Sequence, residues 1–160
     1  MIVYHGGTDI VLTPRIVPAY TGRDFGVGFY TTYIREQAVK WAKRQALYRK
    51  KAEAVLNEYE LADSAIHQLI VKTFDDYSMD WLDFVVECRR DAAHRHGFDL
   101  VIGKIANDDV GETIQAVIDG LTSKDFALSK LAFMHVNNQI CFSTDRALGF
   151  LKHISSERVN

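Results

Sequence analysis

Two glycines followed by aromatic residues, in the segment Phe25-Gly26-Val27-Gly28-Phe29-Tyr30, constrain the fold more than any other part of this chain. A dinucleotide-binding βαβ unit needs a third glycine at a fixed spacing and a clear strand before the first, and neither is present. The Gly-Lys-Ser/Thr sequence of a phosphate-binding loop is also missing. The segment therefore predicts a tight turn that leads into a strand, with Phe29 and Tyr30 on opposite faces.

Strand-like and helix-like patterns are interspersed along the chain. Besides the strand that follows the glycine turn, strands are predicted at residues 2–5, 54–61, 68–74, 98–105 and 138–143. Helices are predicted at residues 34–50, 79–96, 112–119, 124–133 and 146–153, and Gly97 would end the second of them. No clean βαβ unit opens at the glycine turn, so the pattern favours an α+β fold over a doubly wound sheet. The length predicts one domain spanning residues 1–160.

The formal net charge is −2, from 19 basic and 21 acidic residues, which gives no bulk attraction to nucleic acid or to an anionic membrane. The predicted helix 34–50 and its end are locally basic, through Lys40, Lys43, Arg44, Arg49, Lys50 and Lys51. Such a cluster is typical of a solvated helix face. Contact with a nucleic acid or an acidic partner is the alternative.

The two cysteines, Cys88 and Cys141, are expected to be buried thiols in a reducing compartment. The first residues lack the basic and apolar regions of a signal peptide, and no apolar run approaches the roughly 20 residues that cross a bilayer. We therefore expect a cytoplasmic protein with no membrane partner, or export by a route that leaves no N-terminal mark.

Three short segments carry residues suited to a binding site. Tyr4-His5-Gly6-Gly7 ends the first predicted strand, and its glycines would let a ligand approach the backbone closely. The glycine turn with Tyr30 is the second segment. The third, Asn137 to Phe142, predicts a turn into a strand whose Gln139 faces away from the core. Each segment alone is also typical of plain structure: a hydrogen-bonding histidine, a tight turn and an ordinary strand.

Taken together, the three segments resemble the ADP-ribosyltransferase superfamily, in its diphtheria-toxin and poly(ADP-ribose) polymerase branch. That branch has a strand ending in His-Gly, a Gly-x-Gly-x-Tyr turn followed by a helix, and a late strand that opens with Glu. The whole chain also resembles a small uncharacterised bacterial family of this superfamily, through Tyr4 to Gly6, Asp24 to Thr32, Gln37 to Ala42, Trp81 to Phe84 and Ala106 to Asp108.

The resemblance implies two small, mostly antiparallel sheets with helices around them and an NAD⁺ site in the cleft between the sheets. His5 would bond a ribose hydroxyl, the Gly6 backbone would pair with the nicotinamide carboxamide, and Tyr30 would stack on the nicotinamide ring. His5, Tyr30 and Gln139 are the implied catalytic residues. The implied NAD⁺-binding residues are His5, Gly6, Gly7, Phe25, Gly26, Gly28, Tyr30 and Thr31. No metal is implied, and His94 with His96, or Asp75-Asp76 and Asn107 to Asp109, make only weak metal candidates.

Gln139 departs from the resemblance, because a neutral amide stands where that branch has a glutamate. Three outcomes stay open. The Gln139 amide could suffice for transfer to an acceptor that is already a good nucleophile, or another carboxylate such as Asp108, Asp109 or Glu112 could enter the site. In the third, the protein binds NAD⁺-like ligands without turnover. We expect a mono-ADP-ribosyltransferase that modifies a protein or nucleic acid. It would act as a toxin with an antitoxin partner or in phage conflict, and a degenerate binding module is the alternative.

Overall fold

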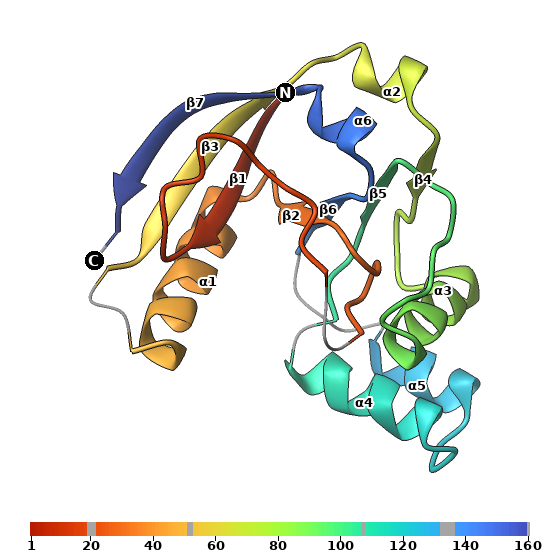
Figure 1. The fold of residues 1–160 in the computed structure, drawn as a ribbon. Coiled ribbons are helices and arrows are strands. Elements are labelled where there is room, and N and C mark those ends of the chain that lie inside the picture. Colours follow the sequence, from red (N-terminus) through yellow and green to blue (C-terminus); the bar gives the residue numbers. More distant parts are fainter. Residues whose placement is uncertain (19–21, 51–52, 107, 132–136, 160) are drawn as a thin grey trace.

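A computed structural model describes residues 1–18, 22–50, 53–106, 108–131 and 137–159. It has the expected α+β architecture, with two mostly antiparallel sheets and surrounding helices (Figure 1). The strands are β1 (Ile2–Gly7), β2 (Phe29–Thr31), β3 (Val55–Leu61), β4 (Val71–Thr73), β5 (Leu100–Gly103), β6 (Gln139–Phe142) and β7 (Leu151–Arg158). The helices are α1 (Arg35–Tyr48), α2 (Ala65–Gln68), α3 (Met79–Arg90), α4 (Asp108–Ile118), α5 (Lys124–Leu131) and α6 (Asp145–Leu148).

The first sheet has the order β1-β3-β7 and is antiparallel throughout. Helix α1 packs on one face of β1 and buries only small side chains, those of Ala38, Ala42 and Ala46. The backbones approach so closely that a Cβ at Gly6 would lie 2.1 Å from the carbonyl oxygen of Ala38. Glycine at position 6 is therefore a requirement of the packing between β1 and α1.

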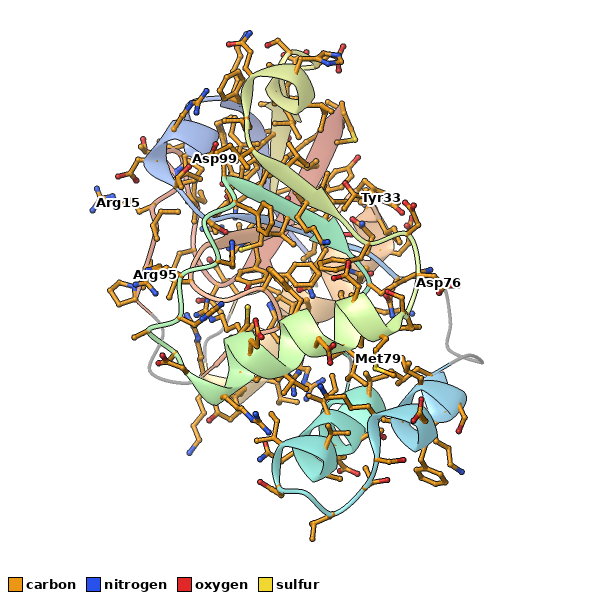
Figure 2. The ribbon with its side chains drawn as sticks, turned by 90° about the vertical axis from the view of Figure 1, so that its right-hand side faces the viewer. Arg15, Tyr33, Asp76, Met79, Arg95 and Asp99 are labelled. Atoms are coloured by element: carbon orange, nitrogen blue, oxygen red, sulfur yellow. The ribbon has the colours of Figure 1, made fainter. Side chains whose placement is uncertain are left out.

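The second sheet has the order β2-β6-β5-β4, and only its β4–β5 pair is parallel. Helix α3 connects these two strands, as a parallel pair requires a crossover. Figure 2 looks onto α3 from the side, with its first residue Met79 labelled, and α4 and α5 lie beyond it from the sheet. This face of the sheet is covered by an apolar cluster that includes Phe25, Trp81 and Cys141.

The other face of the second sheet packs against the first sheet. Phe29, Ile140 and Phe142 meet Val3 and Tyr59 there in a second buried cluster. A backbone bridge between Tyr4 of β1 and Thr32, directly after β2, joins the two sheets. The end of β1 that carries His5 and Gly6 thus lies beside the strand that follows the glycine turn.

The predicted helix 146–153 is wrong beyond its first turn. Helix α6 ends at Leu148, and residues Leu151–Arg158 form β7 instead. This strand pairs along the whole of β3, from Leu61 opposite Leu151 to Val55 opposite Arg158. Pairing with a strand from far along the chain decided the structure, because β-structure depends more on context than on local preference.

The predicted helix 79–96 ends earlier than expected, at Arg90. Gly97 has a positive φ of 79°, as expected of a turn glycine, but it lies within the irregular segment 91–99 rather than at the helix end. Both cysteines are free and buried, as expected, and burial raises the pKa of Cys88 to about 12. Within the described ranges, no helix combines the length and apolar character that a membrane span needs.

Replacing Gly28 by alanine should destabilise the protein by about 1–3 kcal/mol, because overpacking forces rearrangement of a tight contact. A Cβ there would lie 2.4 Å from Cys141 Sγ and 2.6 Å from the Phe142 carbonyl oxygen. Gly111→Ala is the matched control, since it sits in α4 with only ordinary contacts and alanine favours helix. Urea unfolding of both variants measures the difference, and equal stability would contradict the close approach of the turn to β6.

Candidate functional site

The edge of β1 carries a backbone donor and acceptor that no described residue uses. Tyr4 exchanges hydrogen bonds with Thr32 (N···O 2.7 and 2.9 Å), so its N–H and C=O point away from β3. Residues two apart in a strand direct these groups to the same edge, so those of Gly6 also point away from β3. No described residue bonds them. Gly6 is itself a buried residue, and it holds one N–H and one C=O side by side that no described residue bonds.

His5 lies where β1 and β2 separate, and its ring has a defined tautomer. Its Nδ1 is 2.7 Å from the backbone carbonyl oxygen of Tyr30, which can only accept, so Nδ1 carries the proton. Burial lowers the pKa of His5, outweighing the opposing effect of that carbonyl, and the charges of Arg23 and Arg49 lower it further. The imidazole is thus neutral near pH 7, and Nε2 is an acceptor with no described donor.

Gly7 keeps the surroundings of this acceptor open. A Cβ at position 7 would meet only the His5 ring, with Nε2 at 3.4 Å. The His5 ring stacks on Phe29, with centroids 4.5 Å apart. His5 is therefore held by Phe29 and the Tyr30 carbonyl, while its Nε2 faces the side that Gly7 leaves clear.

The glycine turn is held by the hydroxyl of Tyr30. This hydroxyl donates to the Gly26 carbonyl (2.6 Å) and accepts from the Phe25 N–H (3.2 Å). Gly26 has a φ of 74°, a conformation that favours glycine. Phe25 is fully buried, and its backbone N–H and carbonyl are already used by Tyr30 and His96, so the structure leaves no part of this residue free for a ligand. Burial raises the pKa of Tyr30 well above its usual value, and its hydroxyl remains a donor.

The rings of His5 and Tyr30 lie on opposite faces of strand β2, so the structure does not bring these two predicted site side chains into contact. Tyr30 packs with the cluster that covers the α3 side of the sheet, whereas the partner of His5, Phe29, belongs to the cluster between the sheets. The guanidinium of Arg23 stands over the Tyr30 ring, 5.6 Å from its centroid. Thr31, next along the strand, has a buried Oγ1 that is unsatisfied by any described group.

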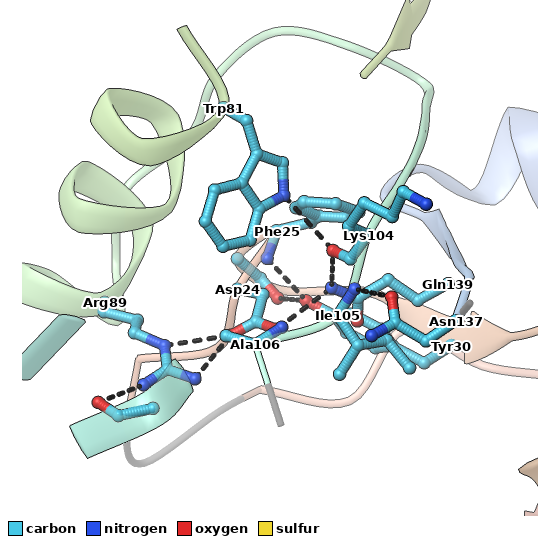
Figure 3. A network of polar contacts seen from close by, with 12 residues as sticks. Asp24, Phe25, Tyr30, Trp81, Arg89, Lys104, Ile105, Ala106, Asn137 and Gln139 are labelled. Carbon is cyan, nitrogen blue, oxygen red and sulfur yellow. Dashed lines mark hydrogen bonds and ion pairs between the residues drawn. The ribbon is translucent and has the colours of Figure 1, made fainter. Parts of the chain in front are cut away.

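Gln139 lies in a buried polar network around Asp24 (Figure 3). Its Nε2 donates to Asp24 Oδ2 (3.0 Å) and to the Lys104 carbonyl (3.2 Å). Asp24 also accepts from the Ala106 N–H at Oδ2 (2.8 Å) and from Arg89 at Oδ1 (Nη2 2.6 Å, Nε 2.8 Å). Four hydrogen bonds and one cation therefore satisfy this carboxylate.

The network fixes which way the Gln139 amide points. Two acceptors face its nitrogen, so the carbonyl oxygen Oε1 is turned away from Asp24. Gln139 is buried, and no described group donates to its Oε1. Hydrogen bonds from the same amide to a carboxylate and a carbonyl polarise it, which strengthens Oε1 as an acceptor. Gln139 thus presents a polarised oxygen rather than an NH₂ group.

Sequence reasoning missed Asp24 and Arg89, which lie 65 residues apart. In the sequence, Asp24 was recognised only as the first residue of the glycine-turn motif. Of the carboxylates suggested instead, Glu112 is exposed on α4, and the side chains of Asp108 and Asp109 lie outside the described residues, as does Asn107. The described carboxylate in contact with Gln139 is Asp24.

Metal binding has no support among the described side chains, where no group of three or more His, Cys, Asp or Glu residues is gathered. An open hollow of about 370 Å³ lies between the end of β3 and the start of β7. It is lined by Glu60, Ala62 and residues 149–152, and none of the predicted site residues reaches it.

Comparison with known proteins gives one match. The chain belongs to the family described as "Protein of unknown function (DUF3990)", whose model matches residues 1–153. This range contains all three candidate segments. No curated protein and no solved structure matches the chain.

Gln139→Glu should destabilise the protein by about 2–4 kcal/mol at pH 8, because a carboxylate would face the Asp24 carboxylate and the Lys104 carbonyl. The difference in free energy of unfolding between variant and parent should become smaller as the pH falls. The introduced carboxyl group, once protonated, has an O–H that can donate a hydrogen bond. Asp24→Asn alone is also costly, since it weakens the pair with Arg89. The double variant Asp24→Asn/Gln139→Glu should lose less free energy of unfolding than the two single variants lose together. In the double variant an amide can again donate to a carboxylate across the same contact.

Denaturant unfolding of the four proteins at pH 6 and pH 8 measures this coupling. Gln68→Glu, at an exposed position, is the control and should change stability by less than about 0.5 kcal/mol. If the double variant loses as much free energy of unfolding as the two single variants together, positions 24 and 139 do not interact.

Proposed function

We propose that this protein is an NAD⁺-dependent mono-ADP-ribosyltransferase that modifies a protein or a nucleic acid. The observation that carries the proposal is the unused N–H and C=O of Gly6 beside the acceptor Nε2 of His5. A carboxamide has one NH₂ and one C=O, so it complements Gly6 as a neighbouring strand would. His5 Nε2 would then accept from a ribose hydroxyl of the same ligand.

Tyr30 and Arg23 support the binding of a planar cation. An aromatic face attracts cations, and a guanidinium already stands over this ring. The nicotinamide ring of NAD⁺ is also planar and cationic. Because the Tyr30 ring lies on the other face of β2 from His5, the nicotinamide ring must enter where β1 and β2 separate and displace Arg23, whose guanidinium then pairs with the diphosphate.

The proposed reaction breaks the bond between ribose C1′ and nicotinamide, and the bonding electron pair leaves with the nicotinamide, which becomes neutral. A lone pair of the acceptor then bonds to C1′. Gln139 Oε1 would hold a ribose hydroxyl and stabilise the positive charge that develops on the sugar. An amide cannot take a proton, so any proton on the attacking atom passes to water. The site therefore suits acceptor atoms that are already nucleophilic when neutral.

A second candidate function is a binding module that holds NAD⁺ or a partner without turnover. It is favoured by the Gln139 amide, which carries no charge, and by Asp24, whose charge is already neutralised by Arg89. The toxin role, with an antitoxin as partner, and the cytoplasmic location are part of the main proposal and are supported by the resemblance of the three segments.

Nicotinamide should compete with NAD⁺ for this site, whereas nicotinate should not. Nicotinate has the same ring but a carboxylate without donors, so it would place an oxygen against the Gly6 carbonyl. Competition calorimetry measures both ligands, and the transfer of labelled ADP-ribose to a cell lysate measures turnover. His5→Ala should abolish transfer, and His67→Ala, at an exposed position on α2, should not. NAD⁺ binding without transfer would favour the binding module, and equal competition by the two ligands would exclude the Gly6 contact.

NAD⁺ binding should be constant from about pH 7 to pH 9 and weaken in acid. The pKa of His5 lies below its usual value of about 6.5, so Nε2 stays an acceptor at neutral pH. Protonation at lower pH converts it into a donor and adds positive charge beside the nicotinamide. A binding titration by calorimetry across this range tests the idea. Tighter binding at pH 5 than at pH 8 would show that His5 does not accept a bond from the ligand.

A further inference from the structure

Helix α1 exposes its large apolar side chains and buries its small ones. The side chains packed on the sheet are three alanines, at positions 38, 42 and 46. Trp41 is 50% exposed, Leu47 82% and Tyr48 83%. A surface helix of a globular protein normally has the reverse arrangement, with large apolar residues facing the core. The outer face of α1 is therefore built for contact with something other than this domain.

The same face is strongly basic. Residues 35–50 contain six Lys or Arg side chains against one Glu, in a chain whose formal net charge is −2. Arg35 is paired with Glu157. Lys40, Lys43, Arg49 and Lys50 are exposed and have no ion pair among the described residues. The Arg44 guanidinium lies 5.8 Å from the centre of the Trp41 ring.

This basic and aromatic face begins at the candidate site. Gln37 and the backbone of Asn138 exchange two hydrogen bonds (2.6 and 3.1 Å), and Asn138 directly precedes Gln139. Helical spacing places Trp41, Arg44 and Tyr48 in one row that starts at Gln37. The row extends about 10 Å from Trp41 to Tyr48 at 1.5 Å per residue. At its far end, the Arg49 charge is close enough to affect His5.

We propose that this face of α1, formed by Trp41, Arg44 and Tyr48 with Lys40, Lys43, Arg49 and Lys50 beside them, binds a single-stranded nucleic acid as the acceptor of the transfer. The role of the bound strand as acceptor of ADP-ribose rests on the proposed function. The binding of the strand to α1 does not depend on it. Bases stack on exposed aromatic rings while the cations pair with phosphates. A duplex hides its base faces, and an acidic peptide has no planar groups for the rings.

The chemistry of Gln139 agrees with this choice. The Gln139 amide cannot take a proton from the attacking atom, so it suits an atom that is nucleophilic when neutral. Unpaired nucleobases offer ring nitrogens with a free lone pair, which attack C1′ without first losing a proton. A nucleobase held on Trp41 stands one helical turn from Gln37 and hence beside the strand that carries Gln139.

Fluorescence anisotropy with short labelled single strands of RNA and of DNA tests the binding. We expect affinity to fall steeply between about 50 and 200 mM salt, because phosphate contacts release counterions. Trp41→Ala/Tyr48→Ala should weaken binding about tenfold or more at every salt concentration. Lys40→Glu/Lys43→Glu should weaken it and reduce the salt slope by about two. The affinities for RNA and for DNA, measured in the same way, show which of the two the α1 face prefers.

Phe126→Ala/Lys130→Glu is the matched control. Phe126 is an exposed aromatic residue on α5 with the Lys130 ammonium 5.3 Å from its ring centre, so it has the same chemistry away from α1. This variant should bind as the parent does. Trp41 fluorescence gives a direct readout, since the other tryptophan, Trp81, is fully buried. Stacking of a base should quench the exposed one.

The outcomes separate this proposal from the proposed function. NAD⁺ binding without oligonucleotide binding, or displacement of the oligonucleotide by an acidic peptide of equal charge more readily than by unlabelled strand, would overturn the α1 surface alone. Oligonucleotide binding that depends on α1, in a protein that does not bind NAD⁺, would keep the surface but end its role as an acceptor site. Loss of NAD⁺ binding in Trp41→Ala/Tyr48→Ala would assign Trp41 to the NAD⁺ site and contradict the proposal.

Discussion

The buried carboxylate of Asp24 organises the centre of this protein. It joins the glycine turn to α3 through Arg89, to the segment after β5 through the Ala106 N–H, and to β6 through Gln139. A buried charge is costly unless it is paired and hydrogen-bonded, and here both oxygens are satisfied. The turn, the strand and the helix must therefore come together in one arrangement, and the amide of Gln139 is oriented as a result.

The second constraint is the close approach of backbones at the glycines. Gly6 lets α1 lie directly on β1, and Gly28 lets the turn lie against β6. The first contact places the exposed row of α1 beside the open edge of β1, and the second places Tyr30 within reach of the turn that it holds. Because the packing already demands these glycines, their identity is explained without a ligand. What packing leaves unexplained is the unused hydrogen-bonding capacity at Gly6, His5 and Gln139.

The sequence was informative where local pattern decides structure. The glycine turn, helix α1 and strand β6 were predicted from turn residues and periodicity, and so was the α+β class. Strand β7 was not, because its pairing with β3 depends on residues about 100 positions away. The partner of Gln139 was missed for the same reason: Asp24 lies 115 positions away in the chain, and no periodicity links the two. Sequence spacing predicted which segments matter, but not how their side chains share hydrogen bonds.

The central claim is that the edge of β1 at Gly6 receives a carboxamide while His5 Nε2 accepts from the attached ribose. The crystal structure of the protein with NAD⁺ tests this most directly. In that complex the nicotinamide carboxamide should form two hydrogen bonds with the Gly6 backbone, and Arg23 should have moved off the Tyr30 ring. NAD⁺ bound elsewhere, or a Gly6 edge closed by the protein's own chain, would contradict it.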